Sequence, residues 1–146
     1  MIDELYQREI LKMAATASHA GRIKEPTHST TIHNPNCGDR ITIDVVLEDN
    51  KIQSYAHETK ACVLCQATAS LIGEYIEGKT VEELCQVETL LTTALQTNTL
   101  TEVKWPAPEW EKLTAFSAVG PHKSRHHCVT LPFEALAALD IKNVHA

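Results

Sequence analysis

Three cysteines are placed where a thiol can bind a metal or accept sulfur, because each is expected at the end of a structural element. Cys37 lies in the turn NPNCGD before a strand, Cys62 at a strand-to-helix junction, and Cys128 just before the last helix. Ligands at the ends of elements can converge without straining the core. We therefore expect these three thiols to meet at one point.

A carboxylate accompanies the first cysteine. Asp39 follows Cys37 by two residues, across Gly38, and can swing toward the same point. Three sulfurs and one oxygen suit the tetrahedral preference of Zn²⁺, while thiolates equally suit iron–sulfur clusters. Cys37, Asp39, Cys62 and Cys128 are thus the candidate ligands, and the three cysteines are also the candidate nucleophiles.

The elements that position these residues follow from the hydrophobic pattern. Apolar residues at helical spacing predict an opening amphipathic helix that ends before Gly21. Apolar and polar residues then alternate from Ile41 to Leu47, and EDNK predicts a hairpin turn into the returning strand KIQSYAH. The chain therefore continues from a helix into a short antiparallel meander.

A run of helices is predicted after Cys62. Gly78 ends the first of them, and Thr80 with Glu83 has the spacing of a capping box that opens the second. A third helix starts near Pro106, and the last, LPFEALAALDI, is expected to open at Thr130 and Pro132. This order predicts an α+β fold in a single domain, residues 1–146. The buried stripe of the third helix is expected to be Trp110, Leu113 and Phe116.

Composition narrows the classes of function. A chain of 146 residues can bury its own core, so it needs no metal merely to fold. The net charge of −6 argues against nucleic acid and anionic membranes as main partners. The N-terminal sequence contains neither a secretory signal nor a membrane span, and five cysteines without an export signal indicate reduced thiols. We expect a cytoplasmic protein.

Three motifs occur in a specific order: NPNCGD, then ACVLCQATASLIGEYIEGKTVEEL, then RHHCVTL. Together they resemble the IscU/SufU/NifU N-terminal family of iron–sulfur cluster assembly proteins. That family has a C-G-D turn, a second cysteine leading through a helix to Gly-Lys, and a last cysteine before the C-terminal helix. The resemblance spans roughly residues 1–143.

The resemblance implies a fold, a site and a function. The fold would be a small antiparallel three-stranded sheet packed against several helices, with the site at one end. Cys37, Cys62 and Cys128 would be the cluster or sulfur ligands, and Asp39 the accompanying carboxylate. The protein would be a cluster scaffold, a zinc-dependent acceptor of persulfide sulfur, or both, and a sulfurtransferase-like carrier rather than a conventional enzyme.

The resemblance also implies cofactors and partners. The cofactors would be zinc and a transient [2Fe–2S] cluster. A cysteine desulfurase of the SufS, IscS or NifS type would donate the sulfur, and apo iron–sulfur proteins or cluster carriers would receive the product.

The segment between Cys62 and Cys128 favours one branch of the family. It is longer than in IscU-type members and contains the predicted helix from Trp105 to Phe116, an insertion that resembles the SufU branch. Arg125 fits the R-x-x-C pattern of SufU, whereas His127 stands where IscU-type proteins carry a histidine. The chain is most similar to SufU but has features of both branches.

Two positions depart from the family pattern. Ala61 replaces the usual glycine before the second cysteine, which would move Cys62 if a positive φ were required there. Cys65 creates a C-x-x-C motif and is an alternative ligand, a resolving thiol or a buried core residue. Cys85, in the next predicted helix, is expected in the core.

Two charged or titratable neighbours of Cys128 also have alternative roles. His127 is either an extra ligand or an exposed histidine. Arg125 either neutralises an anionic site or is a solvated surface charge.

Two other functions fit parts of the sequence. A thiol oxidoreductase would use Cys62 and Cys65, but it lacks the preceding βαβ pattern and leaves Cys37 and Cys128 unexplained. A structural zinc module that only binds other proteins is the second alternative. Exchange of the zinc and reactivity of the thiols toward a persulfide donor distinguish that module from a sulfur carrier.

Overall fold

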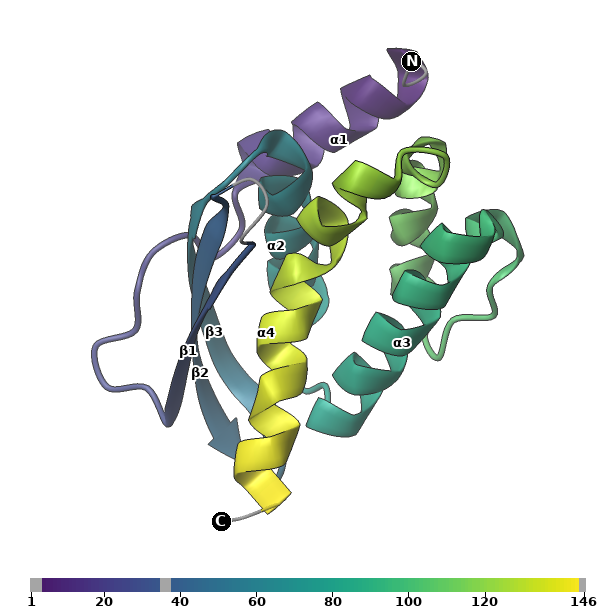
Figure 1. Ribbon diagram of the computed structural model, residues 1–146. Coiled ribbons are helices and arrows are strands. Elements are labelled where there is room, and N and C mark those ends of the chain that lie inside the picture. The colour runs from purple at the N-terminus through teal and green to yellow at the C-terminus, as the bar shows by residue number, and fades with distance from the viewer. Residues whose placement is uncertain (1–3, 35–37, 145–146) are drawn as a thin grey trace.

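One helix, three strands and a run of helices follow one another along the chain (Figure 1). The computed structural model describes the backbone of residues 4–34 and 38–144, and the side chains of residues 8–34 and 38–139. The predicted α+β class is confirmed. The elements are α1 (Glu4–Thr16), β1 (His28–His33), β2 (Arg40–Glu48), β3 (Lys51–Lys60), α2 (Val63–Tyr75), α3 (Val81–Thr97), the 3₁₀ helices η1 (Leu100–Glu102), η2 (Pro108–Val119) and η3 (Lys123–Arg125), and α4 (His126–Val144).

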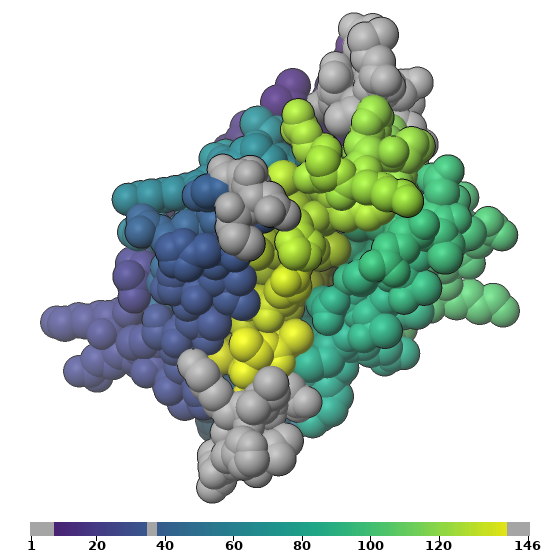
Figure 2. Space-filling view, in the orientation of Figure 1, coloured from purple at the N-terminus to yellow at the C-terminus, as the bar shows by residue number. Residues whose placement is uncertain are grey.

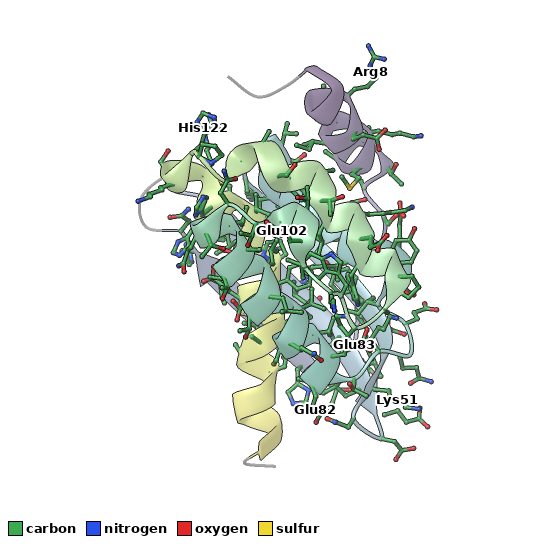
Figure 3. The ribbon with its side chains drawn as sticks, turned by 90° about the vertical axis from the view of Figure 1, so that its right-hand side faces the viewer. Arg8, Lys51, Glu82, Glu83, Glu102 and His122 are labelled. Carbon is green, nitrogen blue, oxygen red and sulfur yellow. The ribbon has the colours of Figure 1, made fainter. Side chains whose placement is uncertain are left out.

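The strands form one antiparallel sheet in the order β1, β2, β3. Asp49 and Asn50 join β2 to β3, and both have positive φ. Two consecutive residues with positive φ are typical of a type I′ hairpin turn, and Asp and Asn tolerate this conformation. Asn50 Nδ2 also donates hydrogen bonds of 2.6 and 2.7 Å to the Glu82 carboxylate. The predicted hairpin is thereby tied to the start of α3, and Lys51 and Glu82 lie at the same end of the molecule (Figure 3).

Helices cover one face of the sheet. α4 packs on β1 and β2, α2 packs on β3, and α3 packs on the far side of α4. The space-filling view shows α4 between the sheet and α3 (Figure 2). Ile41, Ile43 and Val45 of β2 are fully buried on the helix side, as their alternation with polar residues predicted. One hydrophobic core thus lies between the sheet and the helices.

The first helix ends where the sequence predicted, before Gly21. Ile10 of α1 is buried, whereas the expected apolar residues Ile2, Leu5 and Tyr6 lie outside the described side chains. The chain after α1 approaches α2 closely at Gly73, where a Cβ would lie 2.6 Å from the Ser18 carbonyl oxygen. No described helix is long and apolar enough to cross a membrane.

The other face of the sheet carries a buried acid. Asp44 was predicted on the polar face of β2, yet its exposed fraction is 0% because the segment between α1 and β1 covers it. Its carboxylate accepts hydrogen bonds from Arg22 Nε at 2.6 Å, Ser29 Oγ at 2.7 Å and the Ile23 N–H at 3.0 Å. Burial raises the pKa of Asp44, but these donors together hold it below its ordinary value. The ionised carboxylate therefore anchors this segment to the sheet.

The segment that contains the predicted Trp105–Phe116 helix is helical over Pro108–Val119, but it is a 3₁₀ helix. Its buried residues recur every third position, which is the period of a 3₁₀ helix. Trp110 Nε1 donates a 2.8 Å hydrogen bond to Glu83 Oε2, which fixes η2 to the start of α3. The fully buried residues are Trp110, Leu113, Phe116 and Val119.

The last helix begins earlier than the sequence predicted. α4 starts at His126, directly after η3, so Cys128 lies in its first turn rather than before it. Pro132, expected to open the helix, lies inside it. Proline has no backbone N–H, so α4 lacks the helical hydrogen bond that would end on the Cys128 carbonyl.

We predict that Asp44→Asn lowers the free energy of unfolding by about 1–3 kcal/mol, because an amide cannot accept all the hydrogen bonds that the buried carboxylate accepts. Urea denaturation at neutral pH measures the effect. Asp49→Asn, in the exposed turn, is the matched control and should change stability by less than about 0.5 kcal/mol. Equal effects of the two substitutions would contradict the anchoring role.

The pH dependence of stability gives a second measure of the same carboxylate. Because the folded pKa of Asp44 is lowered, its contribution is complete above the ordinary value of 3.8 and is lost as the pH falls through the folded pKa. As the pH falls below 3.8, the free energy of unfolding of Asp44→Asn should therefore decrease less steeply than that of the wild type.

Candidate metal centre

Three ligand atoms from three parts of the chain converge at one end of the sheet. The Sγ atoms of Cys62 and Cys128 and a carboxylate oxygen of Asp39 all lie within 4.8 Å of one another. Asp39 directly precedes β2, Cys62 precedes α2, and Cys128 lies in the first turn of α4. These element starts lie together in the upper part of Figure 1. Among the side chains of residues 8–34 and 38–139, no other set of three Cys, His, Asp or Glu is grouped this closely.

The turn that carries Asp39 is closed by its own backbone. The Asn34 N–H donates to the Asp39 carbonyl at 2.8 Å, and the Gly38 N–H donates to the Asn34 carbonyl at 3.0 Å. Gly38 has a φ of +74°, which glycine adopts at little cost. Asn34 and Asp39 are both buried. The backbone on both sides of Asp39 is therefore tied to Asn34, at the end of β1.

One oxygen of the Asp39 carboxylate lacks a polar partner within the described part of the chain. Asp39 Oδ2 is buried and has no hydrogen-bond partner among the described residues. A buried carboxylate oxygen that has lost water and gained no donor is costly. A cation at this point would satisfy it, and two thiols beside a carboxylate suit a soft or borderline divalent ion such as Zn²⁺. The residues present therefore fit a metal ion.

Cys62 is the N-cap residue of α2, with φ −68° and ψ 169°, and its side chain makes no capping hydrogen bond. Its thiol is therefore not used to cap the helix. Ala61 does not have a positive φ, so alanine is accommodated here without the strain that the missing glycine suggested. The Gln66 side chain donates a 2.9 Å hydrogen bond to the Ala61 carbonyl and helps to hold the junction.

The other two described cysteines do not join this group. Cys65 is fully buried in the hydrophobic core, on the same helix that begins after Cys62. Cys85 is half-buried and packs against the core, as expected. The core interpretation of Cys65 is therefore confirmed, and its proposed roles as ligand or resolving thiol receive no support.

The remaining predicted residues are placed as follows. Cys37 lies outside the described residues, although its neighbours Gly38 and Asp39 are described. His127 is exposed, and its Nε2 lies 3.9 Å from Glu134 Oε2 rather than in the ligand group. Arg125 is an exposed residue of η3. Both side chains are thus surface groups near the start of α4.

Two residues that support the ligands were not identified from the sequence. Asn34 closes the turn of Asp39 through its backbone, and the Asn-Pro pair before C-G-D was the available signal for that turn. His126 Nε2 forms a 2.8 Å hydrogen bond with the Gly120 carbonyl and so ties the start of α4 to the end of η2. No spacing rule pointed to this histidine.

Curated relatives share parts of this chain. A protein of Archaeoglobus fulgidus named iron–sulfur cluster assembly scaffold protein IscU is 30% identical over 83 residues, which are 57% of this chain and 54% of that protein. The chain therefore matches about half the length of this relative. The zinc-dependent sulfurtransferase SufU of Bacillus subtilis is 23% identical over 135 residues, 92% of this chain and 88% of that protein.

Solved structures share the fold. A NifU-like N-terminal protein of Brucella abortus superposes with a TM-score of 0.84 at 29% sequence identity, covering 93% of this chain and 92% of that one. A protein of Fervidobacterium islandicum, described as an iron–sulfur cluster assembly scaffold for the SUF system, has a TM-score of 0.75 at 21% identity and covers 88% of this chain and 90% of that one. The latter supports the fold alone.

The family model of the NifU-like N-terminal domain matches residues 5–129, which is most of the 146-residue chain. This match includes the turn of Asp39 and the positions of Cys62 and Cys128. The chain belongs to the NifU-like N-terminal domain family.

Proposed function

We propose that this chain is an iron–sulfur cluster assembly protein that accepts persulfide sulfur from a cysteine desulfurase and acts as a cluster scaffold, a zinc-dependent sulfur acceptor, or both. The convergence of Asp39, Cys62 and Cys128 within 4.8 Å is the observation that carries the proposal. The names of the IscU and SufU relatives support the same function. Apo iron–sulfur proteins or cluster carriers would receive the product.

The proposed zinc ligands are Asp39, Cys62, Cys128 and Cys37. Zinc prefers four ligands in tetrahedral geometry, and Cys37 is separated from Asp39 by Gly38 alone. When bound, zinc would stabilise the deprotonated form of the thiols. A [2Fe–2S] cluster would be cargo that uses the same side chains.

Sulfur transfer uses a thiolate of this chain as the nucleophile. The thiolate attacks the outer sulfur of the donor's persulfide, a new S–S bond forms on this chain, and the donor's S–S bond breaks. The donor cysteine leaves as a thiolate, so the step consumes no oxidant. Cys62 is half-buried whereas Cys128 is only 4% exposed, which makes Cys62 the more accessible of the two described thiols.

Asp39 gives the proposed site a weak ligand. A carboxylate binds a soft metal less tightly than a thiolate does, so it is the side chain that leaves the metal most readily. The backbone hydrogen bond from Asn34 to the Asp39 carbonyl would keep it nearby when it is released. This arrangement suits transfer better than permanent storage.

The oxidoreductase alternative accounts for less of the structure than the proposed function does. Cys62 is grouped with Asp39 and Cys128, a set that a C-x-x-C pair leaves unexplained, and the named relatives are cluster scaffolds and a sulfurtransferase. The proposal itself requires a reducing compartment such as the cytoplasm, because the thiols must stay reduced to act.

Metal analysis of two neighbouring cysteine variants tests the ligand set. We expect Cys62→Ala to lose most of its bound zinc, because it removes one of four ligands. Cys65→Ala is the matched control on the same motif and should keep the wild-type zinc content. Equal zinc in the two variants would contradict the assignment of Cys62.

Mass spectrometry after incubation with a SufS-type desulfurase and cysteine tests sulfur acceptance. The wild-type chain should gain the mass of one sulfur atom, and a reducing agent should remove it. Cys62→Ser should abolish the gain if Cys62 is the acceptor. A wild-type chain that binds zinc tightly and never gains sulfur would favour the structural zinc module.

Visible absorption after addition of ferrous iron, desulfurase and cysteine tests the scaffold role. We expect Asp39→Ala to retain an assembled cluster longer than the wild type or to impair its release to an apo acceptor, because the weak ligand is gone. An unchanged transfer rate would count against a role of Asp39 in release.

A further inference from the structure

A row of basic side chains crosses the sheet at the end where the proposed metal centre lies. His33 of β1 is opposite Arg40 of β2, and Arg40 is opposite Lys60 of β3. Residues directly opposite each other in an antiparallel sheet project from the same face. Arg40 and Lys60 carry full positive charges at neutral pH, and like charges in this position destabilise a sheet.

Within the described residues, no ion pair offsets this repulsion. Neither Arg40 nor Lys60 forms an ion pair with any residue in the described ranges. The next row on the same face, Thr31, Thr42 and Glu58, contains one acid. Lys60 and His33 are exposed and Arg40 is half-buried, so the row faces solvent.

The basic character extends to every segment that carries a proposed ligand. Arg40 directly follows Asp39, Lys60 precedes Cys62 by two residues, and Lys123 and Arg125 precede Cys128 by five and three residues. Lys123 and Arg125 of η3 are exposed beside the start of α4. Glu82 lies toward the end of the molecule opposite to His122, where Lys51 also lies (Figure 3). Four basic residues are therefore close in sequence to the proposed ligands of a chain whose net charge is −6.

One ligand atom of the proposed centre, Asp39 Oδ2, does not use these charges. A base that served only to neutralise the centre would be expected to contact a ligand, yet Asp39 Oδ2 has no partner among the described side chains. The row lies on the face of β2 that carries Thr42, whereas Ile41 and Ile43 face the helices. A binding partner outside the chain accounts for a solvent-facing row better than the centre does.

We propose that the row His33, Arg40 and Lys60 is a docking surface for an acidic surface on the protein that donates sulfur. This inference rests on the proposed function, which requires a donor protein to reach Cys62. An acidic partner would turn the repulsion between Arg40 and Lys60 into attraction and would steer the encounter toward the thiol end. The net charge of −6 makes nucleic acid a poorer occupant.

Two substitutions in one strand test the proposal. Lys60→Glu and Lys51→Glu change exposed lysines at opposite ends of β3 and alter the net charge equally. Lys60 is opposite Arg40, whereas Lys51 is opposite Glu48. The probe is a purified SufS-type cysteine desulfurase with cysteine, and the readout is the rate of sulfur transfer to this chain at limiting protein concentrations, at low and high salt.

We expect Lys60→Glu to slow transfer about tenfold at low salt, with the difference shrinking at high salt as the charges are screened. Lys51→Glu should transfer sulfur at the wild-type rate. Lys60→Glu should raise the melting temperature, because it creates an attractive pair with Arg40. Lys51→Glu should lower the melting temperature, because it creates a repulsive pair with Glu48. A variant that is more stable and yet slower separates docking from folding.

Three results would overturn the inference. Equal transfer rates of the two variants, with an active wild type, would reject the docking surface and leave the proposed function intact. Loss of zinc from Lys60→Glu would assign the row to the metal centre instead. A wild-type chain that accepts no sulfur would reject the proposed function and this inference with it.

Discussion

The buried carboxylate of Asp39, held beside two thiols, is the constraint on which the rest of this structure depends. Three ionisable side chains that share less than 5 Å of space repel one another when charged, and one of their oxygens has neither water nor a described donor. A cation resolves both problems. The three ligand atoms are held together by the backbone hydrogen bond between Asn34 and Asp39, by the left-handed Gly38 and by the starts of two helices.

Distant contacts keep these elements in place. On the outer face of the sheet, Asp44 and Arg22 fasten the segment between α1 and β1, which also packs against α2 near Gly73. On the helix side, Trp110 and Glu83 fasten η2 to α3, and the end of η2 holds His126 at the start of α4. The contact of His126 lies two residues before Cys128 and so helps to hold the first turn of α4, which carries that thiol.

Helices and strands with a clear hydrophobic period could be predicted from the sequence. The residues at which these elements begin and end were harder to predict, because local contacts decide them. Alternation identified the buried face of β2, and Cys62 was correctly placed at the start of a helix. Pro132 resembled a helix start, but η3 runs directly into α4 and the proline lies inside it. Asp44 looked solvent-exposed, because the segment that covers it comes from elsewhere in the chain and no local pattern predicts that contact.

Pro132 has a consequence for how a thiol can move. In an uninterrupted helix, shifting the first turn breaks a hydrogen bond for each residue that moves. Here the bond that would run from residue 132 to the carbonyl of Cys128 cannot form, so the first turn of α4 can tilt about this point at a lower cost. Cys128 lies in that first turn, so the backbone that carries this thiol is held by one hydrogen bond fewer than in an uninterrupted helix.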